Sequence, residues 1–191
     1  TALLVKADIT DEDETRGMFS EIEKRFSHLD ILILNASGGL EKDKAADYAM
    51  QLNLTSQVRL LRGAIPLMPQ GSRVIFITSH LAHFYGRKSV YEYYVPVAAS
   101  KKAGEDALRS CIPELSAKGI TLIVVSGDLI EGTITPKLMN RNAPGLIEAR
   151  RSDWTLVKSL LDLSRGLSFH AAIQTEVDAI VSQRSLLDEP N

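Results

Sequence analysis

The stretch 73-RVIFITS-79 is a short apolar run that ends in two hydroxyl side chains. Two similar runs, 30-DILILNA-36 and 120-ITLIVVS-126, lie before and after it, and segments with helical periodicity separate the three. Continuous apolar strands that alternate with helices are typical of a parallel sheet covered on both faces. The sequence therefore predicts an α/β fold with a doubly wound parallel sheet.

The other predicted elements follow the same alternation. We expect a further strand at 2–9, a helix from Thr10 to Ser27 with a Thr10–Asp13 capping box, and helices at 45–68 and 96–118. Met18, Ile22 and Phe26 mark the apolar face of the first helix. Residues 80–95 are expected to form a loop, and short helices are expected at 154–163 and 169–181, with no clear seventh strand.

Composition sets limits on the class of protein. The chain has 191 residues, a net charge of -2, 45% hydrophobic and 24% charged residues, which is typical of one globular domain, here 1–191. No basic excess indicates a nucleic-acid partner, and no apolar run approaches the roughly 20 residues of a membrane span. The single cysteine, Cys111, indicates a reducing compartment, and we expect a cytoplasmic location. No metal site is expected, because His80 and His83 form a loop pair without further ligands at metal spacing.

Polar residues stand at the carboxyl ends of the predicted strands, where open α/β sheets bind ligands. Asp8, Asn35 with Ala36, Ser79 and Gly127 should therefore line one edge of the sheet.

Two polar residues fall on apolar helical stripes. Lys101 lies in the stripe Val97, Lys101, Gly104, Leu108, Cys111 and Leu115, whereas Lys102 points away. A buried ammonium is costly without polar surroundings, so Lys101 either reaches solvent at the helix end or serves a polar pocket. Asn53 lies in the stripe Met50, Asn53, Gln57, Leu61 and Ala64, where a capping or surface role and a functional role are equally open.

The order Asn53, Ser79, Lys101 resembles the short-chain dehydrogenase/reductase family over about residues 4–133. KADIT resembles the end of the family's third strand, and LNASGG is similar to the Asn-Asn-Ala-Gly turn after the fourth. VIFITS resembles the strand that ends in the catalytic serine, and AASKKAGEDAL the helix that carries the Tyr-x-x-x-Lys pair. VVSGDLIEGT is similar to the loop that closes over the nicotinamide.

The resemblance implies an oxidoreductase that transfers a hydride between NAD or NADP and a small carbonyl or alcohol, with Asn53, Ser79 and Lys101 as catalytic residues. It also allows a homo-oligomer. The residues implied in cofactor binding are Asp8, Ile9, Asn35, Ala36, Ser37, Lys101, Gly127, Leu129, Ile130 and Thr133.

Three departures from the family pattern qualify this expectation. Val97 stands where the family has its catalytic tyrosine, and Gly127-Asp128 stands where Pro-Gly is usual. The change at Val97 is accompanied by a loop before Lys101 that is longer than usual. This loop contains Tyr94, which is our candidate for the missing phenol; the alternative for Tyr94 is a packing or lid residue.

The third departure is that the family's first strand and its Gly-rich turn do not occur in these residues. The sequence thus predicts a Rossmann-like domain seen without its first two strands and incomplete at the N-terminus. Two alternatives remain: a non-catalytic member that binds a nucleotide or a partner, and a flavodoxin-like regulatory domain, which would leave Lys101 and Asn53 unexplained.

Overall fold

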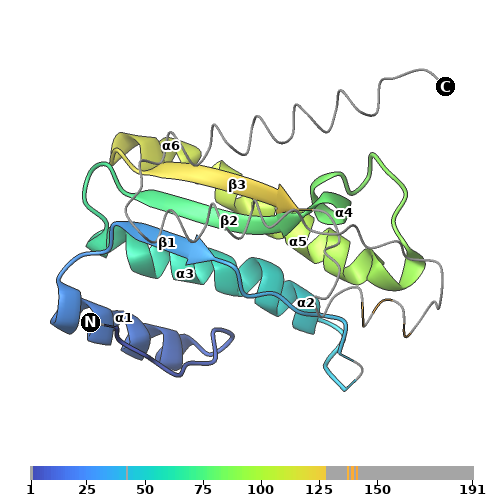
Figure 1. Cartoon of the computed structure of the whole chain (residues 1–191), viewed down its shortest axis with the longest axis horizontal. Helices are drawn as coiled ribbons and strands as arrows, with labels where there is room; N and C mark the ends of the chain where they lie inside the picture. Colours follow the sequence, from blue (N-terminus) through green and yellow to red (C-terminus); the bar gives the residue numbers. More distant parts are fainter. Residues whose placement is uncertain (1, 42, 128–136, 138, 140, 142–191) are drawn as a thin grey trace.

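Three parallel strands form one sheet in the computed structural model, which describes residues 2–41, 43–127, 137, 139 and 141 (Figure 1). The strands are β1 (Ile31–Leu34), β2 (Arg73–Ser79) and β3 (Thr121–Gly127), in the order β1-β2-β3. Leu34 pairs with Phe76, and Ser79 pairs with Gly127, so the carboxyl ends of all three strands lie at the same edge. The predicted α/β class with a parallel sheet is confirmed, as are the three strands themselves.

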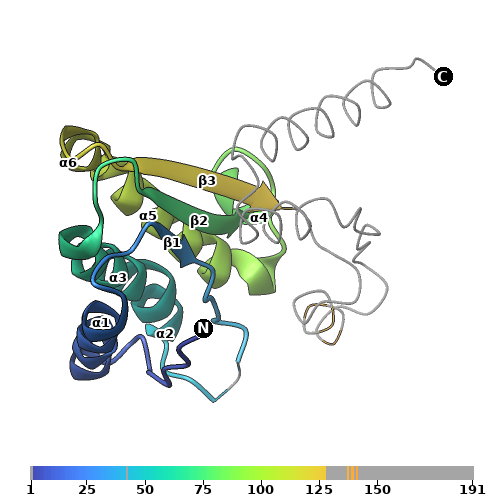
Figure 2. The same ribbon diagram turned by 60° about the vertical axis from the view of Figure 1, so that its left-hand side comes forward.

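Helices connect the strands in the predicted positions. They are α1 (Glu12–Phe26), α2 (Tyr48–Met50), the π-helical η1 (Gln51–Thr55), α3 (Ser56–Ala64), the 3-10 helix η2 (Ile65–Leu67), α4 (His80–His83), the 3-10 helix η3 (Glu92–Tyr94), α5 (Val95–Ser110) and α6 (Ile112–Ala117). Both α3 and α5 lie against one face of the sheet, and α1 packs on the outer side of α3 (Figures 1 and 2).

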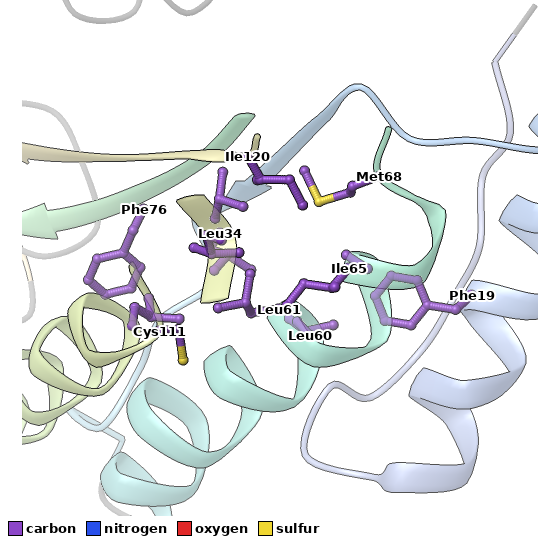
Figure 3. Close-up of a cluster of buried hydrophobic side chains, with 13 residues drawn as sticks. Phe19, Leu34, Leu60, Leu61, Ile65, Met68, Phe76, Cys111 and Ile120 are labelled. Atoms are coloured by element: carbon purple, nitrogen blue, oxygen red, sulfur yellow. The ribbon is translucent and has the colours of Figure 1, made fainter. Parts of the chain in front are cut away.

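The core fills the layer between the sheet and these helices. Leu34, Val74 and Phe76 point from alternate strand positions toward the helices, as the two-residue period of a strand requires. Figure 3 shows Leu61 of α3 close to Leu34, with Phe19 reaching in from α1. The buried members of this core are Phe19, Leu34, Leu60, Leu61, Ala64, Ile65, Met68, Val74, Phe76, Leu108, Cys111, Leu115 and Ile120.

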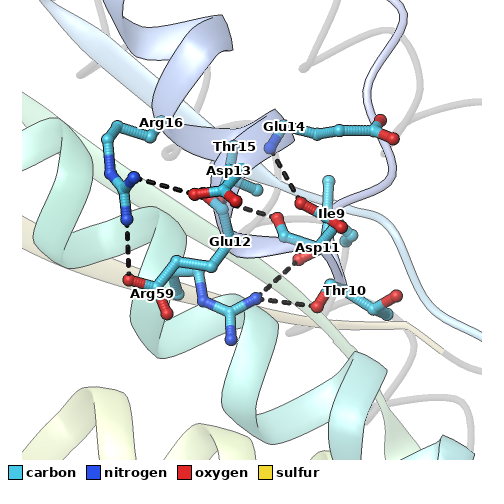
Figure 4. A network of polar contacts seen from close by, with 9 residues as sticks. All are labelled: Ile9, Thr10, Asp11, Glu12, Asp13, Glu14, Thr15, Arg16 and Arg59. Carbon is cyan, nitrogen blue, oxygen red and sulfur yellow. Dashed lines mark hydrogen bonds and ion pairs between the residues drawn. The ribbon is translucent and has the colours of Figure 1, made fainter.

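The predicted strand at 2–9 is wrong. Residues 2–8 have no regular secondary structure, and the Leu4 side chain is 98% exposed. A strand needs a neighbour for its N–H and C=O groups, and no described strand lies beside these residues. Arg59 of α3 holds the following turn instead, because its Nη1 donates to the carbonyl oxygens of Thr10 at 2.9 Å and Ile9 at 3.4 Å (Figure 4).

The start of α1 and part of its inward face differ from the prediction, whereas Met18 and Ile22 pack against the core as expected. Asp11, rather than Thr10, caps the helix, since its Oδ1 accepts from the Glu14 N–H at 2.9 Å. The buried face contains Thr15 and Phe19, because the Phe19 ring lies directly over Gly63 of α3. Phe26 is 41% exposed and does not belong to this face.

The segment 80–118 is more broken than expected. The predicted loop 80–95 contains α4 and η3, and the predicted helix 96–118 is two helices, α5 and α6. The break falls at Cys111 because Pro113 cannot donate a backbone hydrogen bond to the turn before it. The expected helices at 154–163 and 169–181 lie outside the described residues.

Candidate active site

Ser79 and Tyr94 meet at the carboxyl end of the sheet. Ser79 is the last residue of β2, and its Oγ lies 3.3 Å from the Tyr94 hydroxyl. The same Oγ accepts from the Ala82 N–H at 3.2 Å, so that Ser79 is the N-cap of α4. Tyr94 ends η3, immediately before α5, and is 3% exposed. The long loop therefore brings a phenol to the serine, as the sequence suggested.

The environment of Tyr94 keeps its phenol protonated. Burial raises the pKa of Tyr94 above its ordinary value of 10.0, and the hydrogen bond with Ser79 opposes this rise only in part. A neutral phenol at the edge of the sheet is a proton donor at neutral pH. Such a group can protonate an oxygen that gains negative charge during a reaction.

Lys101 is buried, whereas its neighbour Lys102 is not. Lys101 is 8% exposed, and among the described residues its ammonium has no hydrogen-bond or ion-pair partner. Burial lowers the pKa of Lys101 from 10.5 to about 8. Lys102 forms an ion pair with Asp106 one turn further along the same helix. The prediction that Lys101 lies on the inward face of its helix is confirmed, and an ammonium without a partner among the described residues is a group that a ligand can bind.

The lowered pKa of Lys101 should make the free energy of unfolding depend on pH. Because the folded-state pKa of Lys101 is lowered, the unfolded chain binds more protons than the folded one between about pH 8 and 10.5, so the free energy of unfolding rises over this window. Between about pH 7 and pH 9.5, we expect the free energy of unfolding of the unsubstituted protein to rise by about 2 kcal/mol more than that of Lys101→Met. Urea unfolding of both proteins at the two pH values measures this gain, and parallel pH profiles would contradict it.

Asn53 links the loop after β1 to α5. It is 2% exposed, and its Nδ2 donates to the Gly38 carbonyl at 2.9 Å and to the Ser100 Oγ at 3.0 Å. Ser100 in turn donates to the Val97 carbonyl at 3.0 Å. The predicted inward stripe of this helical run is confirmed except at Met50, which is 41% exposed, whereas the adjacent Ala49 is buried. The role of Asn53 in ordering a water molecule stays a prediction.

Gly104 lets the two site helices touch backbone to backbone. A Cβ at this position would lie 2.1 Å from the Asn53 carbonyl oxygen, inside the π-helical η1. Such a close approach is available only to glycine. Gly104 is three residues after Lys101, so this contact fixes the distance between the helices that carry Lys101 and Asn53.

The predicted cofactor residues other than Lys101 lie at the edge of the sheet, outside the sheet, or outside the described residues. Asn35, Ala36 and Ser37 follow β1 at the sheet edge and are exposed, and the Ala36 carbonyl accepts from Gln57 Nε2 at 3.0 Å. Gly127 ends β3 beside Ser79. Asp8 and Ile9 lie outside the sheet, so the prediction that Asp8 ends a strand is wrong. Asp8 accepts from the Thr10 hydroxyl and N–H, which lower its pKa. Leu129, Ile130 and Thr133 lie outside the described residues.

The two histidines after Ser79 contact different elements. His80 Nδ1 lies 3.3 Å from the Ser126 Oγ on β3, and His83 Nδ1 lies 2.9 Å from Glu105 Oε1 on α5. They are not arranged as a metal pair, and within the described residues no three His, Cys, Asp or Glu side chains form a metal-binding group. The sequence did not single out Glu105. Its position one turn after Lys101, beside the inward stripe, was the signal available.

Comparison with known proteins shows the family of this chain. The family model described as short chain dehydrogenase matches residues 1–143. The chain belongs to the short-chain dehydrogenase family. Within it, the chain is 27% identical over 133 residues to 1-cyclohexenylcarbonyl-CoA reductase of Streptomyces collinus, covering 66% of this chain and 46% of the relative. It is 29% identical over 154 residues to 3-oxoacyl-[acyl-carrier-protein] reductase MabA of Mycobacterium avium, covering 75% of this chain and 58% of the relative.

A solved structure shows a similar fold. The crystal structure of NADH-dependent reductase A1-R' complexed with NAD matches with a TM-score of 0.56 and 28% identity, covering 66% of this chain and 56% of that chain. The parallel sheet is thus the Rossmann-like sheet of the short-chain dehydrogenases, as the motif resemblance implied. The chain spans about half the length of the curated relatives that it matches over 131–133 residues.

A groove of about 650 Å³ lies between α1 and α3, away from the candidate site. None of Asn53, Ser79, Tyr94 and Lys101 lines it. We therefore place the candidate site at the carboxyl ends of the strands. Across residues 2–41 and 43–127, no helix has the length and apolar content that a membrane crossing requires.

Proposed function

We propose that the protein is an NAD(P)-dependent short-chain oxidoreductase that transfers a hydride between nicotinamide and a small carbonyl or alcohol substrate. The observation that carries this proposal is the Ser79–Tyr94 pair, 3.3 Å apart, on the elements that flank the buried Lys101. The two curated relatives described above are both reductases. Reduction of a carbonyl needs a proton donor, and the Tyr94 phenol is the donor that lies beside Ser79.

The residues at the sheet edge fit a dinucleotide. The Lys101 ammonium has no partner among the described residues and would bind hydroxyl groups of the ribose. Asn35, Ala36 and Ser37 are exposed at the end of β1, where the edge is open to a ligand. A bound nicotinamide supplies the hydride chemistry, which no protein side chain can provide.

The side chains of this protein hold the substrate and deliver the proton. Ser79 would hold the substrate oxygen, and Tyr94 would donate a proton to that oxygen as the carbonyl is reduced. Lys101 would bind the ribose, and its charge would stabilise the phenolate that Tyr94 leaves after donation. Asn53, tied to Gly38 and Ser100, would keep α5 in place and order a water molecule for proton return.

The apolar surroundings of Tyr94 favour a substrate with an apolar substituent. Val97 and Met139 are buried beside Tyr94, and Leu81 and Tyr91 pack against this cluster. Val97 thus contributes an apolar surface where the family has its tyrosine. The alternative of a non-catalytic member requires a site without a phenol near Ser79, and the position of Tyr94 supports the catalytic proposal instead.

Cofactor binding is the direct test of this proposal. We expect NADH or NADPH to raise the unfolding free energy of the protein, because a ligand selective for the folded state stabilises it, by about 2.7 kcal/mol at a concentration 100 times its Kd. Thermal unfolding with each cofactor measures the effect, with adenosine as a control that lacks the nicotinamide. No shift with either cofactor at millimolar concentration would contradict the proposal.

Three further points remain predictions that accompany this function. They are a single domain over 1–191, a homo-oligomeric state and a cytoplasmic location.

A further inference from the structure

The four-residue helix α4 is held at both of its ends by histidine side chains. His80 at its start contacts Ser126 of β3, at 3.3 Å between Nδ1 and Oγ. His83 at its end contacts Glu105 of α5, with Nδ1 at 2.9 Å from Oε1 and 3.0 Å from Oε2. A single helical turn is not stable by itself, so such tertiary contacts decide whether α4 forms.

The contact with Glu105 is the more buried of the two. The Glu105 side chain is 2% exposed, whereas Ser126 and His80 lie in a more open position. A buried carboxylate needs hydrogen-bond donors, and Glu105 has two: His83 and the Arg109 Nε at 2.8 Å. A carboxylate only accepts hydrogen bonds, so a bond between it and His83 uses the tautomer that carries a proton on Nδ1.

We propose that His83 is a positioning residue, which sets the Ser79 hydroxyl relative to α5 through its bond with Glu105. This inference rests on the proposed function, in which Ser79 and Lys101 act on one substrate and cofactor. Glu105 is one helical turn after Lys101 on α5, and His83 is four residues after Ser79. The His83–Glu105 bond therefore joins the helix of Lys101 to the helix that Ser79 caps.

Two hydrogen bonds, one at each end of α4, connect Glu105 to Ser79 through this helix. The His83–Glu105 bond fixes the end of α4, and this short helix presents the Ala82 N–H to the Ser79 Oγ at 3.2 Å. That Oγ also contacts the Tyr94 hydroxyl. If α4 loosens, Ser79 loses the donor that orients its lone pairs, and the serine no longer presents one fixed direction to the substrate oxygen.

Two substitutions at His83 separate its hydrogen bond from its volume. In His83→Leu no donor remains, and we expect kcat to fall about 10- to 100-fold with little change in the KM for NADH or NADPH, because misplacement of about 1 Å costs up to about 10² in rate. In His83→Asn the side-chain amide lies near the former Nδ1 and can donate to Glu105. This variant should keep kcat within about threefold.

The matched control is His28→Leu, which makes the same change at a histidine whose partner, Asp30, is exposed. The assays use the intact protein and the carbonyl compound that it reduces fastest among a panel of small ketones and aldehydes. If His83→Leu does not fold, His83→Leu combined with Glu105→Gln removes the bond without leaving a buried carboxylate that has lost one of its donors, and the same loss of kcat is expected.

Hydrogen exchange tests the contact without requiring turnover. We expect exchange of the Ala82 amide to accelerate at least tenfold in His83→Leu and to stay near its original rate in His83→Asn and His28→Leu. Unchanged exchange, or an unchanged kcat in His83→Leu, would overturn the proposal. If the unsubstituted protein reduces no compound of the panel, the proposed function fails, while the exchange rates still decide whether His83 holds α4.

Discussion

Tyr94→Phe should lower turnover by about 10² to 10⁴, the usual contribution of a general acid, and should leave the affinity for NADH or NADPH nearly unchanged. The substitution removes one hydroxyl, which lies 3.3 Å from the Ser79 Oγ, and keeps the buried ring. Because Tyr94 would act on the substrate oxygen and Lys101 on the ribose, the loss should fall on kcat. Steady-state kinetics with a carbonyl substrate, and cofactor titration by fluorescence, measure the two quantities.

The preceding residue provides a matched control. The Tyr93 hydroxyl is also buried, but it has no hydrogen-bond partner among the described residues. Tyr93→Phe removes a group that forms no bond there, so we expect unchanged turnover and equal or slightly higher stability. Full activity of Tyr94→Phe would contradict the proposal that Tyr94 is the acid. Equal losses of turnover in Tyr93→Phe and Tyr94→Phe would indicate that both hydroxyls act through the packing of η3.

Gly104→Ala should destabilise the fold by more than about 3 kcal/mol, beyond the usual cost of adding a methyl group to a packed interior. The new Cβ would lie 2.1 Å from the Asn53 carbonyl oxygen, which is backbone and cannot rotate away. The helices α5 and η1 must therefore separate, and the Asn53–Ser100 hydrogen bond between them would lengthen. Urea unfolding monitored by circular dichroism measures the loss.

A second helical glycine gives the opposite expectation. Gly17 lies in α1 with nothing within 4 Å of its Cβ position. Gly17→Ala should raise the unfolding free energy by about 0.5 to 1 kcal/mol, because alanine restricts the unfolded chain and favours helix. If Gly104→Ala is as stable as the unsubstituted protein, the backbone contact between α5 and η1 does not exist in solution.

Local sequence patterns determined most of the architecture. The runs at 30–36, 73–79 and 120–126 became the three strands because short, continuous apolar runs that alternate with helical segments are typical of buried parallel strands. The apolar helical stripes predicted that Lys101 and Asn53 are buried, because residues three and four apart share one face of a helix. The motif order around Asn53, Ser79 and Lys101 indicated the family that the comparison then showed.

Contacts between distant segments decided the rest. The sequence alone could not show that residues 2–8 lack a strand, because an apolar run becomes a strand only beside a partner. It also could not show that His83 meets Glu105, which is 22 positions further along the chain, or that Tyr94 reaches Ser79. Periodicity assigns a residue to a face, but hydrogen bonds depend on how α4, α5 and η3 pack together, and only the tertiary structure fixes that packing.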